Sequence, residues 1–148
     1  MGNGQVISVN VSEDTGESKH DVGRRKVVAG FGLEGDAHGG DWHRQVSLLA
    51  EESIDRMRVK GLEVGPGAFG ENMTTRGIDL ASLPVGKRLG VGETVVLEVT
   101  QVGKECSKPC AIYYKVGECV MPGEGVFARV LEGGEIARGD EIKVIRHD

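Results

Sequence analysis

The stretch Glu93–Gln101 reads ETVVLEVTQ, and its apolar residues alternate with others along the whole stretch. Val95, Leu97 and Val99 share one face, and the residues between them form the other. Because successive side chains of a strand point to opposite faces, this period of two predicts a β-strand with one buried face. The same alternation identifies further strands in the rest of the chain.

Other short stretches resemble this strand. Gln5–Val11 is rich in β-branched residues, Lys26–Ala29 is a short apolar stretch, Val46 and Leu48 alternate with Ser47, and residues 139–145 read GDEIKVI. The chain has 24 glycines among 148 residues, about twice the ordinary usage of roughly 7%. They show no regular period, which indicates many turns between short strands.

Two stretches have helical character. Glu51–Lys60 has acidic residues in its first turn and basic residues in its last, which complements the helix dipole, and Ile54 and Met57 would share its buried face. Residues 125–131 place Val126, Phe127, Val130 and Leu131 at one-face helical spacing. Short strands with one or two short helices predict a mainly β barrel or sandwich. No repeat or boundary divides residues 1–148, so we expect a single domain.

Composition limits the classes of partner. The net charge is -5 and the estimated pI is 5.4, which argues against a nucleic-acid or membrane-surface footprint. No apolar run approaches the roughly 20 residues that cross a bilayer, and the start of the chain lacks the features of a signal peptide. Three cysteines without an export signal predict free thiols in a reducing, cytoplasmic compartment.

The cysteines gather in one part of the chain. Cys106 and Cys110 lie in GKECSKPCAIYY, flanked by Lys104 and Lys108, and Cys119 follows in an apolar run. Neighbouring cations lower the pKa of a thiol and favour the reactive thiolate, but a buried cysteine also serves as a small apolar residue. Packing is the preferred interpretation for Cys119, and both remain open for Cys110. The Cys-x3-Cys spacing suits zinc, but the second pair of ligands is missing.

A glycine-rich loop is the second candidate. Residues 32–45 read GLEGDAHGGDWHRQ and supply donors, acceptors and charges from Asp36, His38, His43, Arg44 and Gln45. Glycines let a backbone approach a ligand closely, His38 could change protonation near neutral pH, and Arg44 could bind a phosphate. The same residue types also form surface turns. Their density favours a ligand site, although the spacing matches no Walker or Rossmann motif.

Two weaker candidates remain. Glu71 and Asn72 in FGENMTT could bond a polar heterocycle or cap the next element, and capping is preferred. Gly125 would open the second helix with Arg129 one turn in, which suits an anion as well as it suits an ordinary helix start.

Together these residues resemble a known family, the MOSC domain, and in particular its small stand-alone bacterial members. The resemblance covers nearly the whole chain and rests on five blocks in this order: GLEGDAHGG, WHRQVSLL, FGENMTT, LEVTQVGKECSKPC and CVMPGEGVFARVLEGGEIARGDEI. It implies a β-barrel similar to the barrel of pyruvate kinase. The family hallmark is a cysteine after a strand, and Pro109-Cys110 matches it. In related amidoxime-reducing enzymes that cysteine ligates molybdenum, and in sulfurases the domain is thought to help deliver sulfur.

The resemblance implies binding of the molybdenum cofactor, a molybdopterin, with Cys110 as metal ligand or persulfide carrier and Cys106 as a possible second thiol. The expected cofactor-binding residues are Asp36, His38, His43, Arg44, Gln45, Asn72, Lys104 and Lys108. The alternatives are a molybdenum-dependent reductase of N-hydroxylated compounds and a non-catalytic sulfur carrier. Larger relatives carry fused ferredoxin or aminotransferase domains that this sequence lacks, so a cysteine desulfurase or a flavin reductase is the expected partner.

Overall fold

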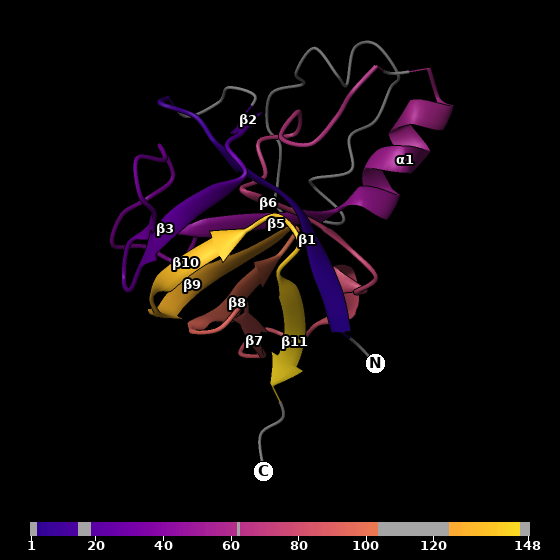
Figure 1. Ribbon diagram of the computed structural model, residues 1–148. Coiled ribbons are helices and arrows are strands. Elements are labelled where there is room, and N and C mark those ends of the chain that lie inside the picture. Colours follow the sequence, from indigo (N-terminus) through magenta and orange to yellow (C-terminus); the bar gives the residue numbers. More distant parts are fainter. Residues whose placement is uncertain (1–2, 15–18, 62, 104–124, 146–148) are drawn as a thin grey trace.

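The predicted strands at residues 5–11, 46–48, 93–101 and 139–145 contribute to a closed barrel in the computed structural model, which describes residues 3–14, 19–61, 63–103 and 125–145 (Figure 1). In order around the barrel the strands are β11 (Glu141–Ile145), β7 (Arg88–Val91), β8 (Val95–Val102), β9 (Val126–Glu132), β5 (Val46–Ala50), β6 (Met73–Arg76) and β1 (Asn3–Val11). Pairing of β1 with β11, which places Asn3 opposite Lys143, closes the ring of seven. The predicted mainly β barrel is confirmed.

Smaller elements surround this barrel. β2 (His20–Asp21) pairs with the end of β1, and β10 (Gly134–Ala137), β3 (Arg24–Val28) and β4 (Gly32–Leu33) form a separate three-stranded sheet. The β5–β6 pair is parallel, and a parallel pair needs a crossover connection rather than a hairpin. That crossover contains α1 (Glu51–Val59), and a single 3-10 turn, η1 (Leu80–Ser82), follows β6.

The core follows the predicted alternation. Val95, Leu97 and Val99 of β8 are each 1% exposed and point into the barrel. Burying a side chain of this size contributes about 1.5–3 kcal/mol, so the facing strands hold the barrel closed. A second apolar cluster lies outside the barrel, where Ile54 and Met57 of α1 pack with Leu49, Phe69 and Phe127. The helix and its buried face are therefore as predicted.

The second predicted helix is wrong, because Val126–Glu132 is strand β9. Val126, Ala128 and Val130 face the barrel core, and Phe127 faces the cluster under α1. Because Phe127 is buried on the outer face while Val126, Ala128 and Val130 are buried on the inner one, the apolar residues of this strand mimic helical spacing. The anion site expected at a helix start near Gly125 is wrong for the same reason. Arg129 is paired with Glu98 across the strand surface, 2.6 Å between nitrogen and oxygen.

Among the described residues, no helix has both the length and the apolar character that crossing a membrane would require.

Candidate functional site

The glycine-rich loop folds closely on itself. Gly32 has φ +129°, and a Cβ there would lie 2.5 Å from the carbonyl oxygen of Gln45. A Cβ on Gly39 would lie 2.4 Å from the ring of Phe31, and the Gly40 N–H donates to the Phe31 carbonyl at 2.9 Å. Only glycine fits the close approaches at Gly32 and Gly39. Gly32 thus lets the two ends of the loop meet, and Gly39 lets the middle of the loop pack against Phe31.

Asp36 is the buried anchor of this loop. Its Oδ1 lies 2.8 Å from Lys19 Nζ, and neither side chain has exposed surface. The same oxygen accepts from the Ser12 backbone N–H at 3.0 Å, and Oδ2 accepts from the His38 N–H at 3.0 Å. Burial raises the pKa of Asp36, but hydrogen bonds from Lys19, Asn72 and Ser12 outweigh it and leave the pKa lowered. The carboxylate is thus ionised and sets the backbone direction at His38.

Asn72 and Gln45 are two further buried polar residues. Asn72 is fully buried, its Oδ1 accepts from the Ser47 N–H at 2.9 Å, and its Nδ2 donates to the Asn10 carbonyl at 3.2 Å. Gln45 is 3% exposed, and its Oε1 accepts from the Val130 N–H at 2.9 Å. Both amides tie strands of the barrel together. Their predicted contact with a pterin remains a prediction.

Glu71, next to Asn72, is also fully buried. Its carboxylate accepts from the Gly67 N–H at 2.9 Å, the Phe69 N–H at 3.3 Å and the Thr74 hydroxyl at 2.7 Å. Burial raises its pKa, and these bonds only partly oppose the rise. Glu71 therefore closes the turn that precedes β6 by bonding residues on both sides of itself.

His43, Arg44 and Gln101 form a cluster at the surface. Gln101 Oε1 lies 2.9 Å from His43 Nε2 and accepts from Arg44 Nε at 3.1 Å, while Gln101 Nε2 donates to the Gly103 carbonyl at 2.8 Å. Because Arg44 can only donate and a carbonyl can only accept, the orientation of the amide is fixed. His43 must then donate from Nε2, which makes Nδ1 an acceptor in the neutral ring.

Arg44 is a half-buried cation. Its guanidinium carbon lies 5.0 Å from the centre of the Phe127 ring, a cation–π contact. Within residues 3–14, 19–61, 63–103 and 125–145, no carboxylate forms an ion pair with it. A half-buried guanidinium without a carboxylate is suited to an anionic ligand, which it can bind through two parallel hydrogen bonds.

Trp42 is a functional candidate that the sequence analysis missed. It is 43% exposed, its indole Nε1 donates to the His38 carbonyl at 2.8 Å, and its ring lies parallel to His38 and edge-on to His43. Trp42 therefore contacts both histidines of the segment that also carries Arg44. The sequence feature that could have identified Trp42 is a lone tryptophan among polar and glycine residues, because a tryptophan of the core usually has apolar neighbours.

The predicted thiols and lysines lie outside the described residues. Cys106, Cys110, Lys104 and Lys108, together with Cys119, belong to residues 104–124. The described residues at either end of this stretch, Gly103 and Gly125, are joined by a backbone hydrogen bond of 2.6 Å.

Gly103 is also the residue whose carbonyl Gln101 bonds. The chain therefore enters and leaves the cysteine-containing stretch directly beside the His43–Arg44–Gln101 cluster.

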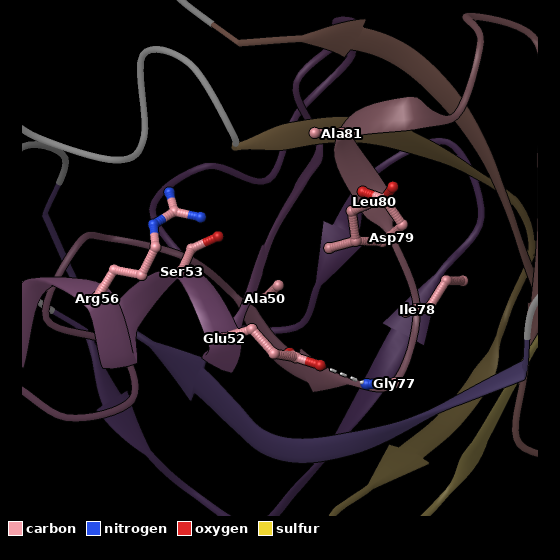
Figure 2. Close-up of a pocket in the computed structure, with 9 residues that line it drawn as sticks. All are labelled: Ala50, Glu52, Ser53, Arg56, Gly77, Ile78, Asp79, Leu80 and Ala81. Carbon is pink, nitrogen blue, oxygen red and sulfur yellow. Dashed lines mark hydrogen bonds between the residues drawn. The ribbon is translucent and has the colours of Figure 1, made fainter.

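A separate pocket lies on another part of the molecule. A cavity of about 370 Å³ opens between the first turns of α1 and residues 77–81, and Figure 2 shows the Glu52 carboxylate reaching the Gly77 N–H at 2.9 Å. None of the predicted site residues that the structure describes lines it. In the part of the chain that the structure describes, no three His, Cys, Asp or Glu side chains are grouped as metal ligands.

Comparison with known proteins gives a consistent result. The family profile described as MOSC domain matches residues 34–143. The YuaD protein from Bacillus subtilis superposes with a TM-score of 0.82 at 18% identity, covering 99% of this chain and 98% of that one. YiiM from Geobacillus stearothermophilus gives 0.70 at 22% identity, with 97% and 75% covered.

YiiM from Escherichia coli gives a TM-score of 0.66 at 21% identity, with 100% and 72% covered. At these identities the likeness shows a shared fold. No curated protein matches the sequence of this chain.

Proposed function

Because this chain belongs to the MOSC domain family, we propose that it binds a molybdopterin-type cofactor and presents Cys110 to it as molybdenum ligand or sulfur carrier. The observation that carries the proposal is the position of Arg44. It is a half-buried cation without a carboxylate partner among the described residues, beside the two glycines that bracket the cysteine-containing stretch. An anion-binding group and a thiol would thus serve one ligand that has both a phosphate and a metal.

The donor set fits the organic part of that cofactor. A pterin offers hydrogen-bonding edges and a flat ring, and its side chain carries a phosphate. Arg44 supplies a guanidinium for the phosphate, and His43 supplies an Nδ1 acceptor whose orientation is fixed by Gln101. A soft thiolate such as that of Cys110 suits molybdenum or terminal sulfur. When bound, the cofactor would supply the redox or sulfur-exchange chemistry of its metal centre.

The chain's own residues have defined tasks in this proposal. Arg44 binds and neutralises the phosphate, and Gln101 orients both Arg44 and His43. Asp36 fixes the backbone of the loop that carries them. Lys104 and Lys108, adjacent in sequence to the thiols, would favour the thiolate form of Cys110.

Cofactor retention tests the proposal. Protein purified from a host that makes the cofactor is expected to carry molybdenum and pterin. Arg44→Ala should lower the pterin content about 10-fold or more, because a charged hydrogen bond contributes about 1.5–3 kcal/mol. The matched control is Arg24→Ala, whose exposed guanidinium lies 3.6 Å from Glu135, and its pterin content should equal that of wild type. Equal retention by Arg44→Ala would contradict the assignment of the phosphate site.

The role of Cys110 separates two versions of the proposal. As a carrier, its thiolate would attack the persulfide of a cysteine desulfurase, take the terminal sulfur and release the desulfurase thiolate. Mass spectrometry would then find one added sulfur on Cys110 in wild type and none in Cys110→Ser. As a metal ligand, Cys110 would instead be needed for molybdenum content while the pterin stayed bound in Cys110→Ser. Both versions place the protein in the reducing cytoplasm.

The alternative function, a reductase of N-hydroxylated compounds, requires catalysis in addition to cofactor binding. It requires turnover of an N-hydroxylated compound with an external flavin reductase as electron donor. Substrate loss that depends on both the reductase and Cys110 would support this activity, and no loss with any donor would remove it.

A further inference from the structure

Trp42 is exposed but held in one orientation. It keeps 43% of its surface accessible, yet its indole N–H is bonded to the His38 carbonyl at 2.8 Å. Its ring is stacked on His38 with centroids 6.3 Å apart at 21°, and it meets His43 edge-on at 5.9 Å. A tryptophan that only filled the core would be buried, and one that only covered the surface would need no such fixed contacts.

The surroundings of Trp42 point to the chemistry of a ligand. Arg44, two residues further on, uses its Nε for Gln101, and its terminal nitrogens have no bond to any described residue. A fixed aromatic face thus lies close in the chain to a guanidinium that is available for an anion. Flat heterocycles stack on aromatic side chains, and phosphates bind guanidinium groups bidentately.

We propose that Trp42 is the stacking surface for the flat ring of a phosphate-bearing heterocycle whose phosphate Arg44 binds. This inference rests on the proposed function and adds to it the residue that recognises the ring. Because the indole is already fixed by His38 and His43, stacking would cost little side-chain entropy. Trp42 would therefore set the preference for a planar ligand, while Arg44 sets the preference for an anion.

The chain contains one tryptophan, so its intrinsic tryptophan fluorescence reports on Trp42 alone. The probes are 6-hydroxymethylpterin, its monophosphate, and guanosine monophosphate, which carries the same two features on a purine. The monophosphate of the pterin is expected to quench the fluorescence in a saturable way, after correction for absorbance by the ligand. Calorimetric titration of the same samples measures binding without depending on the tryptophan.

Three variants complete the test. Trp42→Ala should bind the pterin monophosphate about 5-fold to 150-fold more weakly, which is the range that stacking of a base on an aromatic side chain typically contributes. Trp42→Phe keeps a ring and should recover most of the affinity, which separates stacking from a loss of folding. Val59→Ala is the control, because Val59 is an exposed apolar residue of α1, 89% accessible and outside the loop, and its change should leave binding within about twofold.

The outcomes distinguish the two proposals. Binding by wild type without quenching, and with equal affinity in Trp42→Ala, would overturn the stacking role and leave the proposed function standing. Equal weakening by Val59→Ala would also overturn it. Quenching by guanosine monophosphate as strong as that by the pterin would support stacking but contradict the pterin assignment. No binding of any probe by wild type would overturn both.

Discussion

Asp36 and Lys19 form an ion pair in which neither side chain has exposed surface. Removing two charges from water costs several kcal/mol per ion, so such a pair persists only when further hydrogen bonds satisfy it. Ser12 and the His38 backbone supply them. A residue that the sequence offered as a ligand thus has a structural role visible only in three dimensions, because its partner, Lys19, comes from a different loop.

Asp36→Asn is expected to lower the free energy of unfolding by about 3–5 kcal/mol, because it leaves the Lys19 ammonium buried and unpaired. Chemical denaturation at pH 7 measures this. The matched control is Glu135→Gln, which removes an exposed pair with Arg24 and should change the free energy by about 0–1 kcal/mol. A loss by Asp36→Asn no larger than that of the control would contradict the account of this ion pair.

The same pair predicts a pH dependence. The pKa of Asp36 is lowered from its ordinary value of 3.8 in the folded protein. The unfolded chain therefore binds the proton more tightly, and the stability that Asp36 contributes is present above its unfolded pKa. That contribution is lost as the pH falls through the lower, folded value. The difference in unfolding free energy between wild type and Asp36→Asn should shrink as the pH falls below about 4, and a constant difference would contradict this assignment.

At the scale of elements, the sequence pattern predicts those helices and strands that have one buried face and one exposed face. α1 and β8 each have one buried face, so their periods of 3.6 and 2 are visible in the sequence. β9 buries Phe127 on its outer face as well as the residues of its inner face, so the spacing of its apolar residues resembles that of a helix in the sequence. The sequence shows the glycines of loop 32–45, but it does not show which close contacts require them. Gly32 has to pass the Gln45 carbonyl, a contact between residues 13 apart.

Gly32→Ala tests this contact. The added methyl would meet the Gln45 carbonyl oxygen at 2.5 Å, with φ at +129°. Overpacking of this kind typically costs about 1–3 kcal/mol beyond the backbone strain. Gly30→Ala is the matched control, because Gly30 has φ +70° and an added methyl there would have nothing within 4 Å. It should lose only about 1–2 kcal/mol in thermal or chemical unfolding, and equal losses in both variants would show that the close approach is unimportant.

At the scale of the whole molecule, barrel closure sets the position of the candidate site. β1 pairs with β11, which joins the two ends of the chain, and no local pattern could give that register. In the barrel β8 and β5 both pair with β9, and Gln101 of β8 lies beside His43 and Arg44, although 57 residues separate Gln101 from Arg44. The resemblance to the MOSC family predicted the fold and suggested His43 and Arg44, but not Gln101, because the contacts of Gln101 are made only in the folded barrel.

The most direct test of the central claim is to count molybdopterin in protein from a host that makes the cofactor. The pterin is oxidised to its fluorescent form and quantified per protein chain, beside a double variant, Arg44→Ala with Cys110→Ser, shown to be folded by its thermal unfolding. The account predicts pterin approaching one per chain in wild type and a content at least about 10-fold lower in the double variant. Wild type with no more pterin than the double variant would contradict it.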